Sequence, residues 1–430
     1  MRSKSETLAR NIRILTAALV LASALLACDL PAAPTQTTGA ATIVAQTMDA
    51  LLSATPQPSA LPSPAAGATA TGTPASTAIT STAPAAGSNP LPHSLYFLNN
   101  DKGGLLQIFR LERDGQTLHQ ITFEPANVDG YDVSPKDGSV VYISNNQMLL
   151  VDANGAGRRL LVDGGPVDDS NRFTNSVGTP VWSPDGARIA FGYGGLNLYT
   201  ASTGAVNKVL ENQIDTSAGF PVVRELYWPN KYSPDGSNLL IVISFNEGGT
   251  FGIYHPSDNT LLRFTRAEGG NLCCNIDWVP DGSGLYAASP TMGMIESGLW
   301  YINPVDGKVT TLLPGAAPDS TYNFADAPQV GSDGNLYFFF NNLAAIPTGR
   351  HTPLFLVRSG SDGVTGRTQL KPEAFDNINE VLWAPDASLA VAAFAPTDDV
   401  VAGGRAEIVY PDARPNVLLA SFAEELRWGP

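Results

Sequence analysis

Trp182-Ser183-Pro184-Asp185-Gly186-Ala187-Arg188-Ile189-Ala190-Phe191 is the stretch that decides the fold, because its central turn recurs along the chain. The other copies are Ser134-Pro135-Lys136-Asp137-Gly138, Ser233-Pro234-Asp235-Gly236, Val279-Pro280-Asp281-Gly282, Gly331-Ser332-Asp333-Gly334, Ala384-Pro385-Asp386-Ala387 and the final Trp428-Gly429-Pro430, which matches only the opening. Counted between the prolines, with Ser332 in place of the missing one, the steps are 49, 50, 46, 52, 53 and 45 residues. A period of this size indicates a repeat architecture.

The repeated turn has the residues of a tight hairpin. Proline presets φ for the second position of a type I turn, aspartate tolerates the third position, and glycine accepts the positive φ that follows. A short apolar segment precedes each turn, often with tryptophan two residues before the proline, and an apolar run such as residues 239–243 follows it. Two further strand-like runs complete each repeat, as at residues 299–302 and 309–312. Four strands joined in this way are typical of one blade of a β-propeller.

Counting these strands, lettered a to d within each blade, predicts the number of blades. Sets of strands b, c and d begin near Ser94, Ser139, Ala187, Ser237, Ser283, Asn335 and Ser388. The a strands end at Ser134, Ser183, Ser233, Val279, Gly331, Ala384 and Gly429. The two series are displaced, since the first set lacks an a strand and the last a strand lacks a set. We therefore predict an all-β, seven-bladed β-propeller of four-stranded antiparallel blades, with six blades as the alternative if one faint copy is not a blade.

The displaced series also predicts how the propeller closes. Residues 424–429, at the end of the chain, are expected to pair with the strand that begins near Ser94 and so to complete the first blade. Closure of this kind removes exposed sheet edges, which otherwise favour aggregation.

The pattern W-S-P-D-G-x-x-I-A-F, cleanest at residues 182–191, resembles the TolB-like (WD-repeat-like) β-propeller family. The resemblance covers roughly residues 93–430 and implies the fold. It does not imply an activity, because propellers carry enzymes, scaffolds and binding modules alike. The chain also departs from the protein after which the family is named, which has an α/β domain ahead of six blades. A role in the Tol system is therefore not transferred.

Residues 1–27 have the organisation of a bacterial lipoprotein signal peptide. A positive segment holding Arg2, Lys4, Arg10 and Arg13 precedes an apolar run at residues 14–26, which is short for a membrane span. Leu25-Leu26-Ala27-Cys28 resembles a lipobox, and in lipoproteins the cysteine becomes the lipidated N-terminus. We predict an extracytoplasmic protein held by lipid on Cys28 at the bacterial cell membrane. An ordinary secretory signal and an uncleaved anchor are the alternatives.

Residues 28–92 are predicted to be a disordered tether between the lipid and a propeller domain at residues 93–430. Alanine, threonine, proline and serine dominate the segment, and Asp29 and Asp49 are its only charged residues. Such a composition buries too little apolar surface to offset the entropy of ordering. A flexible tether of this length reaches roughly 45 Å.

The charge of the chain limits its partners. The formal net charge is −15, and removing residues 1–27 takes away four basic and one acidic side chain, which gives −18. An acidic protein disfavours nucleic acid and anionic lipid headgroups, so we expect no nucleic-acid partner and membrane contact through the lipid only. We also expect a monomer.

The sequence carries no recognisable catalytic constellation. No nucleophile elbow, Walker loop, zincin helix or CxxC pair is present, and the four histidines, His93, His119, His255 and His351, have no metal-ligand spacing. We assign no catalytic residue, metal or cofactor. Paired carboxylates for glycoside chemistry stay open, because propeller enzymes draw them from different blades.

The long connections are predicted to gather on one side of the propeller, which we call the long-loop face. They are the b–c connections within residues 289–298, 341–353 and 395–404 and the d–a connections within residues 164–179, 212–224 and 313–325. Binding residues concentrate on loops held by a rigid scaffold. The candidate ligand-binding residues on this face are Arg172, Phe173, Arg224, Glu225, Cys273, Cys274, Tyr322, Asn323, Asp326, Glu380 and Glu425.

Some of these candidates belong to a wider pattern of acidic and amide residues ahead of the a strands. Asp129, Glu225, Asn275, Asp326, Glu380 and Glu425 are expected either to ring the channel mouth and hold a cation, an amine or sugar hydroxyls, or simply to solvate a rim.

The adjacent pair Cys273-Cys274 has its own alternatives. Neighbouring Cα atoms lie about 3.8 Å apart, below the usual disulfide range, so a bond between them is strained. A vicinal disulfide forming a rigid apolar platform is one reading, and two reduced thiols or an intermolecular bridge are the others.

Three functions remain open from the sequence. The first is a lipid-anchored binding or scaffold module that recognises an envelope protein, peptide or polysaccharide through the long-loop face. The second is a carbohydrate-active lyase or hydrolase on the same face, and the third is a structural component of an assembly. The sequence does not decide whether the protein is an enzyme, and the missing catalytic constellation favours the first.

Overall fold

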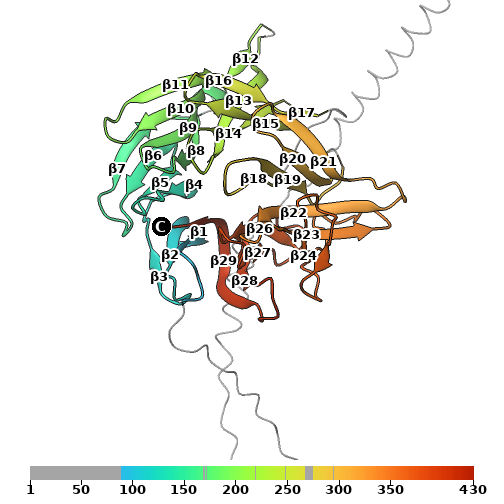
Figure 1. The fold of residues 1–430 in the computed structure, drawn as a ribbon. Coiled ribbons are helices and arrows are strands. Elements are labelled where there is room, and N and C mark those ends of the chain that lie inside the picture. Colours follow the sequence, from blue (N-terminus) through green and yellow to red (C-terminus); the bar gives the residue numbers. More distant parts are fainter. Residues whose placement is uncertain are drawn as a thin grey trace, which may run out of the picture. The chain divides into compact units, whose positions relative to one another are not determined.

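The computed structural model describes residues 89–430 except for 168–169, 171, 218, 247, 267–274 and 294. The chain divides into two units, Met1–Thr82 and Ala83–Pro430, and all described residues belong to the second. Their regular structure is almost entirely β-strand, with one short helix, α3 (Arg172–Asn175) (Figure 1). The predicted all-β class is confirmed. The expectations for Cys28 and the signal peptide lie outside the described residues, and so does the predicted tether except for residues 89–92, where Leu91 is buried in the core.

The four strands of a repeat pair antiparallel in chain order, so that each strand pairs with the next one. Four sheets contain such a set in chain order. Their strands are β4 (Val128–Val133), β5 (Val140–Ser144), β6 (Gln147–Val151) and β7 (Arg159–Asp163); β8 (Val177–Trp182), β9 (Arg188–Tyr193), β10 (Gly195–Thr200) and β11 (Val206–Glu211); β13 (Val222–Tyr232), β14 (Leu239–Phe245), β15 (Gly248–His255) and β16 (Thr260–Arg263); and β22 (Tyr322–Val330), β23 (Leu336–Leu343), β24 (Phe355–Ser359) and β25 (Thr368–Gln369).

Two of the sheets carry an extra strand. A fifth set is formed by β18 (Asn275–Trp278), β19 (Leu285–Ser289), β20 (Gly298–Ile302) and β21 (Lys308–Pro314), and β17 (Thr265–Arg266) joins the outside of β21 in parallel. The other extra strand, β12 (Gln213–Asp215), pairs with the beginning of β13. The connection expected within residues 212–224 is thus partly a hairpin, which projects at the top of Figure 1.

The last sheet joins the two ends of the described chain. It contains β26 (Ile378–Trp383), β27 (Ala390–Phe394), β28 (Gly404–Val409), β29 (Val417–Trp428), β1 (Leu95–Asn100), β2 (Leu106–Leu111) and β3 (Leu118–Gln120), in this order. The first half of β29 pairs with β28, and its second half pairs with β1, where Leu95 lies opposite Trp428. Strand β29 therefore belongs both to the set of β26, β27 and β28 and to the set of β1, β2 and β3.

The repeated phrase forms the predicted turn. Ser183 Oγ donates to Asp185 Oδ1 at 2.6 Å and accepts the backbone N–H of Arg188 at 2.9 Å, while Gly186 has a φ of +66°. The copy at Ser233 repeats these contacts with Asp235 and Asn238. Ala387 takes the glycine position of its copy and still adopts a φ of +57°. In this copy, where alanine also replaces the serine, the backbone N–H of Ser388 donates to Asp386 Oδ1 at 3.0 Å and that of Ala384 donates to the Leu389 oxygen at 2.9 Å.

Three of the four tryptophans that precede the turns link consecutive sets of strands. The indole Nε1 of Trp428 donates to the backbone oxygen of Trp383 at 2.7 Å, and that of Trp383 donates to the oxygen of Ala327 at 2.8 Å. Trp278 makes the same kind of contact with Lys231 at 3.4 Å. Each of these bonds links a strand before a turn to the equivalent strand one repeat earlier, whereas the Nε1 of Trp182 is buried and has no hydrogen-bond partner among the described residues.

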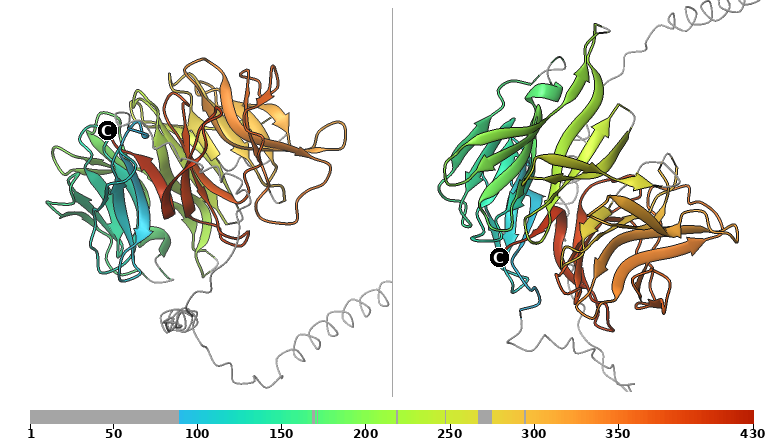
Figure 2. Two further views of the ribbon diagram at one scale, coloured as in Figure 1. Left: turned by 90° about the horizontal axis from the view of Figure 1, so that it is seen from below. Right: turned by 45° about the horizontal axis from the view of Figure 1, so that its top comes forward.

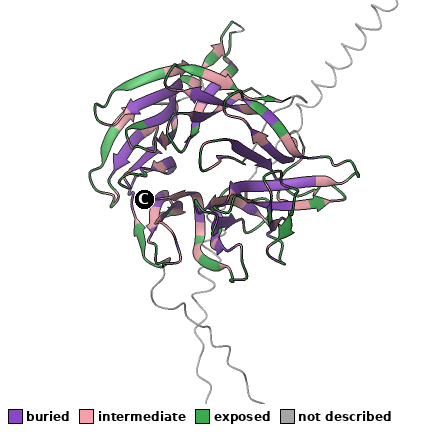
Figure 3. Cartoon of the chain, in the orientation of Figure 1, coloured by how far each residue is buried: buried purple, intermediate pink, exposed green. Residues whose placement is uncertain are grey.

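The core lies between the sheets rather than at one centre. Strands before and after each turn are largely buried, whereas the fourth strands β3, β7, β11, β16 and β25 are mostly exposed (Figure 3). Successive sheets follow one another around a common centre in chain order, as Figures 1 and 2 show. Among the described residues, no helix is long and apolar enough to cross a membrane.

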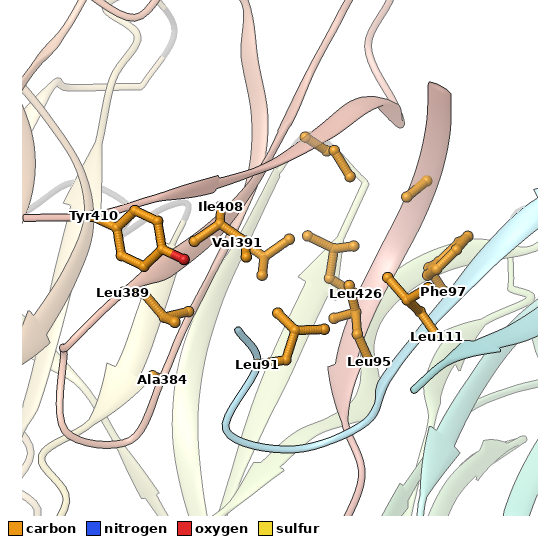
Figure 4. Close-up of a cluster of buried hydrophobic side chains, with 13 residues drawn as sticks. Leu91, Leu95, Phe97, Leu111, Ala384, Leu389, Val391, Ile408, Tyr410 and Leu426 are labelled. Atoms are coloured by element: carbon orange, nitrogen blue, oxygen red, sulfur yellow. The ribbon is translucent and has the colours of Figure 1, made fainter. Parts of the chain in front are cut away.

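One cluster of buried side chains spans the junction made by β29. Leu95 and Phe97 of β1 and Leu426 of β29 pack with Val391 of β27 and Ile408 of β28 (Figure 4). Leu95, Val391, Ile408 and Leu426 are fully buried. The first and last parts of the described chain therefore share one hydrophobic core.

Candidate functional site

Three of the predicted long connections meet at one pocket. They are the loops β19–β20, β23–β24 and β27–β28, which belong to consecutive sets of strands and were all expected on the long-loop face. The pocket has a volume of about 350 Å³. Its lining residues are Pro290, Thr291, Asp326, Gly349, Arg350, His351, Thr352, Leu354, Ile378, Asn379 and Val401.

Asp398, from the β27–β28 loop, holds the β23–β24 loop against the pocket. Its Oδ2 accepts the backbone N–H of Arg350 at 2.9 Å, and its Oδ1 accepts the backbone N–H of His351 at 2.8 Å. These two backbone hydrogen bonds lower the pKa of Asp398. The carboxylate is thus a clamp between two loops, and it is ionised at neutral pH.

His351 is fixed by both of its ring nitrogens. Nδ1 lies 3.2 Å from Asp398 Oδ1, and Nε2 lies 2.8 Å from Asn379 Oδ1. The amide nitrogen of Asn379 donates to the backbone oxygens of Val400 and Gly403 at 3.3 and 2.7 Å, so Oδ1 is the atom that faces His351. Nε2 of His351 therefore carries a hydrogen.

A further hydrogen bond ties the third loop to the same wall. Thr352 Oγ1 donates to the backbone oxygen of Pro290 at 2.7 Å, and Thr352 is buried. Together with the Asp398 clamp, this contact links all three loops to one another. The pocket is consequently formed before any ligand arrives, which reduces the entropy that binding would cost.

Asp326 supplies a buried carboxylate to the pocket. It lies in β22 and is 4% exposed. Its Oδ1 accepts hydrogen bonds from the side-chain amide of Asn275 and from the backbone N–H of Ala327. Burial raises the pKa of Asp326 to about 6, although these two hydrogen bonds act to lower it. The group is therefore charged at neutral pH in an environment that disfavours the charge.

A second charged group surrounds Arg427 of β29, and we call it the Arg427 cluster: Arg427, Asp132, Glu380, Glu425 and Tyr131. The guanidinium lies 3.9 Å from Asp132 Oδ1, 3.8 Å from Glu380 Oε1 and 5.9 Å from the centre of the Tyr131 ring. Glu380 Oε1 also accepts the backbone N–H of Leu426 at 2.7 Å. One cation thus faces three carboxylates from three different sheet segments.

The carboxyl groups of the Arg427 cluster have raised pKa values. Burial raises the pKa of Glu380 to about 7, while the charge of Arg427 acts in the opposite direction. Burial likewise raises the pKa of Asp132 and of Glu425. For Arg427, burial alone would lower the pKa, but Glu425, Tyr131, Glu380 and Asp132 raise it overall. The cluster joins β4, β26 and β29 electrostatically.

The acidic and amide residues expected to ring one channel mouth are divided among separate contacts. Asn275 and Asp326 bond to each other, and Glu380 and Glu425 lie in the Arg427 cluster. Glu225 instead accepts hydrogen bonds from Arg263 at 2.6 Å and from the Tyr227 hydroxyl. The burial of Asp129 raises its pKa. These residues lie within the inner strands rather than ahead of them, because those strands begin earlier than expected.

The remaining candidates occupy other parts of the chain. Arg172 and Phe173 lie in α3, with the guanidinium 5.7 Å from the ring centre. Arg224 pairs with Asp215 at 2.9 Å within the β12–β13 hairpin.

Two more candidates lie at the start of β22, and two cannot be placed. The side-chain amide of Asn323 donates a hydrogen bond to the backbone oxygen of Pro314 and accepts one from the side chain of Asn342. Tyr322 packs against the hydrophobic cluster that contains Phe324. Cys273 and Cys274 lie outside the described residues, so all three readings of the pair stay predictions. Of the predicted ligand-binding residues that the structure describes, Asp326 is the one that lines the pocket.

Several pocket residues were missed from the sequence. The three loops predicted to be long contain Thr291, Arg350, His351 and Asp398, but no sequence motif distinguishes these residues there. His351 was set aside because the histidines lack ligand spacing. Asn379 stands directly before Glu380 in a strand. Only loop length pointed to this region.

The pocket offers hydrogen-bond donors and acceptors, one buried carboxylate and aliphatic side chains. Within the described residues, no group of three or more His, Cys, Asp or Glu side chains could hold a metal ion. This composition is typical of a site that orients a small polar ligand or a segment of a peptide or polysaccharide chain.

Comparison with known proteins gives structural neighbours but no match in sequence. No family model matches the chain, and no curated protein matches it. Similar solved structures include TolB from Acinetobacter baumannii, at 15% identity and a TM-score of 0.39 over 77% of this chain and 81% of that one. Oligogalacturonate lyase from Vibrio parahaemolyticus shows 14% identity and a TM-score of 0.33 over 57% and 83%. Dipeptidyl peptidase 4 from Porphyromonas gingivalis shows 10% identity and 0.46 over 76% and 51%.

Proposed function

We propose that this protein is a lipid-anchored binding module of the bacterial cell envelope, which recognises a protein, peptide or polysaccharide through the pocket on its long-loop face. The proposal places Cys28 at the membrane and residues 28–92 as the tether. The scaffold is a closed propeller of seven blades, and the ligand enters where three blades present their long loops.

Contacts between neighbouring inner strands support the seven-bladed arrangement. Strand β4 contacts β8 and β29, and β8 contacts β13. Lys231 of β13 pairs with Asp277 of β18 at 2.6 Å. Further along, β18 contacts β22, β22 contacts β26, and β26 contacts β29. Followed in this order, the contacts return to the starting strand after seven steps.

The observation that carries the binding role is the mutual attachment of the three loops. Asp398 clamps the β23–β24 loop from the β27–β28 loop, and Thr352 fastens it to the β19–β20 loop. The three loops thus hold one another around a cavity that is lined by a charged, buried side chain, Asp326. Preformed pockets with a few convergent polar groups are the usual form of ligand sites.

The experiment is a binding and turnover test on the full chain. Arrays of envelope peptides and glycans are screened for bound ligands, and each ligand is then incubated with the protein and examined for products. Binding without product supports the binding module, whereas product release supports the carbohydrate-active enzyme. Capture of envelope proteins alone, with no bound peptide or glycan, supports the assembly component.

A matched pair of variants locates the binding in the pocket. Asp398→Ala removes the loop clamp, and Asp399→Ala removes the neighbouring aspartate, whose side chain accepts a hydrogen bond from Thr397 Oγ1 at 2.5 Å. Ligand capture should fall at least tenfold in the first variant and stay within twofold in the second. Equal capture by both variants would place the binding site elsewhere.

A further inference from the structure

We infer that the pocket takes a peptide through a primary amine, which the carboxylate of Asp326 binds at the base of the pocket. This inference rests on the proposed function, because it names the chemistry of the ligand that the long-loop face would bind. Four observations support it: the burial of Asp326, the backbone that aims it, the charge balance around it and the aliphatic lining.

The hydrogen bonds of Asp326 leave part of its carboxylate for a ligand. The hydrogen bonds from the Asn275 side chain and from the Ala327 N–H both go to Oδ1. Among the described residues, no donor lies at hydrogen-bond distance from Oδ2. Asp326 lines the pocket although only 4% of the residue is exposed. A buried carboxylate with an unused oxygen gains most from a donor that enters the pocket.

The backbone at Asp326 is distorted in a way that sets the direction of the side chain. The pairing of β22 with β23 shifts register between Asp326 and Gln329, which marks a bulge. Ala327 has a φ of +45°, which is unfavourable for a residue with a Cβ atom. The indole of Trp383 holds this conformation by donating to the Ala327 oxygen at 2.8 Å. Bulges and strained residues of this kind concentrate at binding sites.

The charge balance selects a cationic group on the ligand. Within the described part of the chain, Asp326 forms no ion pair. Arg350, at the wall of the pocket, forms none either, but it attracts the carboxylate of Asp399. His351 is already engaged by Asp398 and Asn379. A single carboxylate suits an ammonium group, which needs few acceptors, better than a metal ion, which needs several. Arg350 can then contact a carbonyl or carboxylate group of the same ligand.

The lining favours a peptide over a sugar. Pro290, Leu354, Ile378 and Val401 supply the apolar surface, and no aromatic residue is among the described lining residues. Sugar rings usually stack on aromatic faces, whereas aliphatic surfaces accept peptide side chains. The amine has two sources in a peptide, the N-terminus and the side chain of lysine, and both present the same ammonium chemistry.

The test compares peptides that differ only in the amine. A mixed tetrapeptide library, labelled at its C-terminus, is prepared in three forms: with a free N-terminus and no lysine, N-acetylated without lysine, and N-acetylated with one lysine. Binding to the full chain is followed by fluorescence anisotropy. At least one amine-bearing form should bind at least tenfold more tightly than the acetylated, lysine-free form, and the form that does so identifies the source.

The variant Asp326→Asn should remove the preference to within twofold, because asparagine keeps the shape without the charge. Asp277→Asn is the matched control on the neighbouring strand, and it should leave the preference unchanged. If Asp326→Asn does not fold, the acetylation comparison on the native protein decides by itself. Equal binding of all three libraries overturns the inference, as does a preference that survives Asp326→Asn.

Sugar probes and the loop variant separate this inference from the proposed function. Binding of glucosamine in preference to glucose, without any peptide binding, overturns the assignment to a peptide. If Asp398→Ala abolishes capture of an array ligand while Asp326→Asn leaves that capture unchanged, the binding role stands and the amine assignment falls. If neither variant alters capture, both proposals fall.

Discussion

The indole of Trp428 donates a 2.7 Å hydrogen bond to the backbone oxygen of Trp383, 45 residues earlier in the chain. The two residues lie at equivalent positions of consecutive repeats, and the bond crosses the sheet that contains both β26 and β1. The same neighbourhood contains the Arg427 cluster and the hydrophobic core shared by the two ends of the described chain.

Removing residues 424–430 should abolish cooperative folding. The deletion takes away the partner of β1, the buried Leu426 and the positive charge of Arg427 together. Thermal unfolding should lose its single sharp transition, and the protein should aggregate, since β1 becomes an exposed edge. The milder change Trp428→Phe keeps an aromatic side chain but removes the Nε1 hydrogen bond, so it should lower the free energy of unfolding by about 1 kcal/mol. A deletion variant that melts like the parent would contradict the role of β29.

The Arg427 cluster should make the protein less stable as pH rises. The pKa of Glu380 in the folded state is about 7, above its ordinary value of 4.5, so folding favours the protonated form. Its stabilising contribution is complete below about pH 4.5 and is lost as pH rises through about 7. Glu380→Gln should raise the melting temperature at pH 7.5 and not at pH 4.5. Because Glu380 is 27% exposed, we expect water to moderate the change.

Arg427→Gln should destabilise the protein, and more so at pH 7.5 than at pH 5. At the higher pH, Asp132, Glu380 and Glu425 would repel one another without a cation between them, whereas protonation relieves the repulsion at the lower pH. Adding Glu380→Gln should recover part of the lost stability. Chemical denaturation of both variants at the two pH values measures this, and a loss that is equal at both would show that packing of Arg427 dominates over its charge.

Asp326→Asn should stabilise the protein at neutral pH in the absence of ligand. The pKa of Asp326 is about 6 when folded and about 3.8 otherwise, so its charge costs up to about 3 kcal/mol above pH 6. The difference in stability between variant and parent should therefore grow from pH 4 to pH 6 and then level off. Arg350 and His351 line the same pocket. A difference that does not vary over this range would mean that Asp326 is already compensated.

Asp398→Asn should loosen the pocket without unfolding the protein. The change weakens acceptors for the backbone N–H groups of Arg350 and His351 and for the His351 ring. Hydrogen exchange over residues 345–354 should become faster, while the melting temperature should change little. Asp399→Asn should leave exchange in this segment unchanged, and faster exchange in that control would point to a general effect of charge.

The sequence predicted the strands better than the site because hairpins are local. Residues 183–188 contain every side chain that their turn requires, so the turn could be read from one copy and its repeats. The pairing of residues 424–428 with β1 followed from counting the strands. The pocket depends instead on contacts between residues far apart, such as Asp398 with His351, 47 positions away. No local pattern specifies such contacts, and only the lengths of the loops indicated where to look.

The sharing of β29 between two sets of strands has a consequence for biosynthesis. The strand that completes the first set, β29, begins at Val417, whereas its partner β1 begins at Leu95. During synthesis, β1 therefore has one open edge until β29 has been made. Chaperones that shield open strands should bind this chain most strongly before β29 emerges.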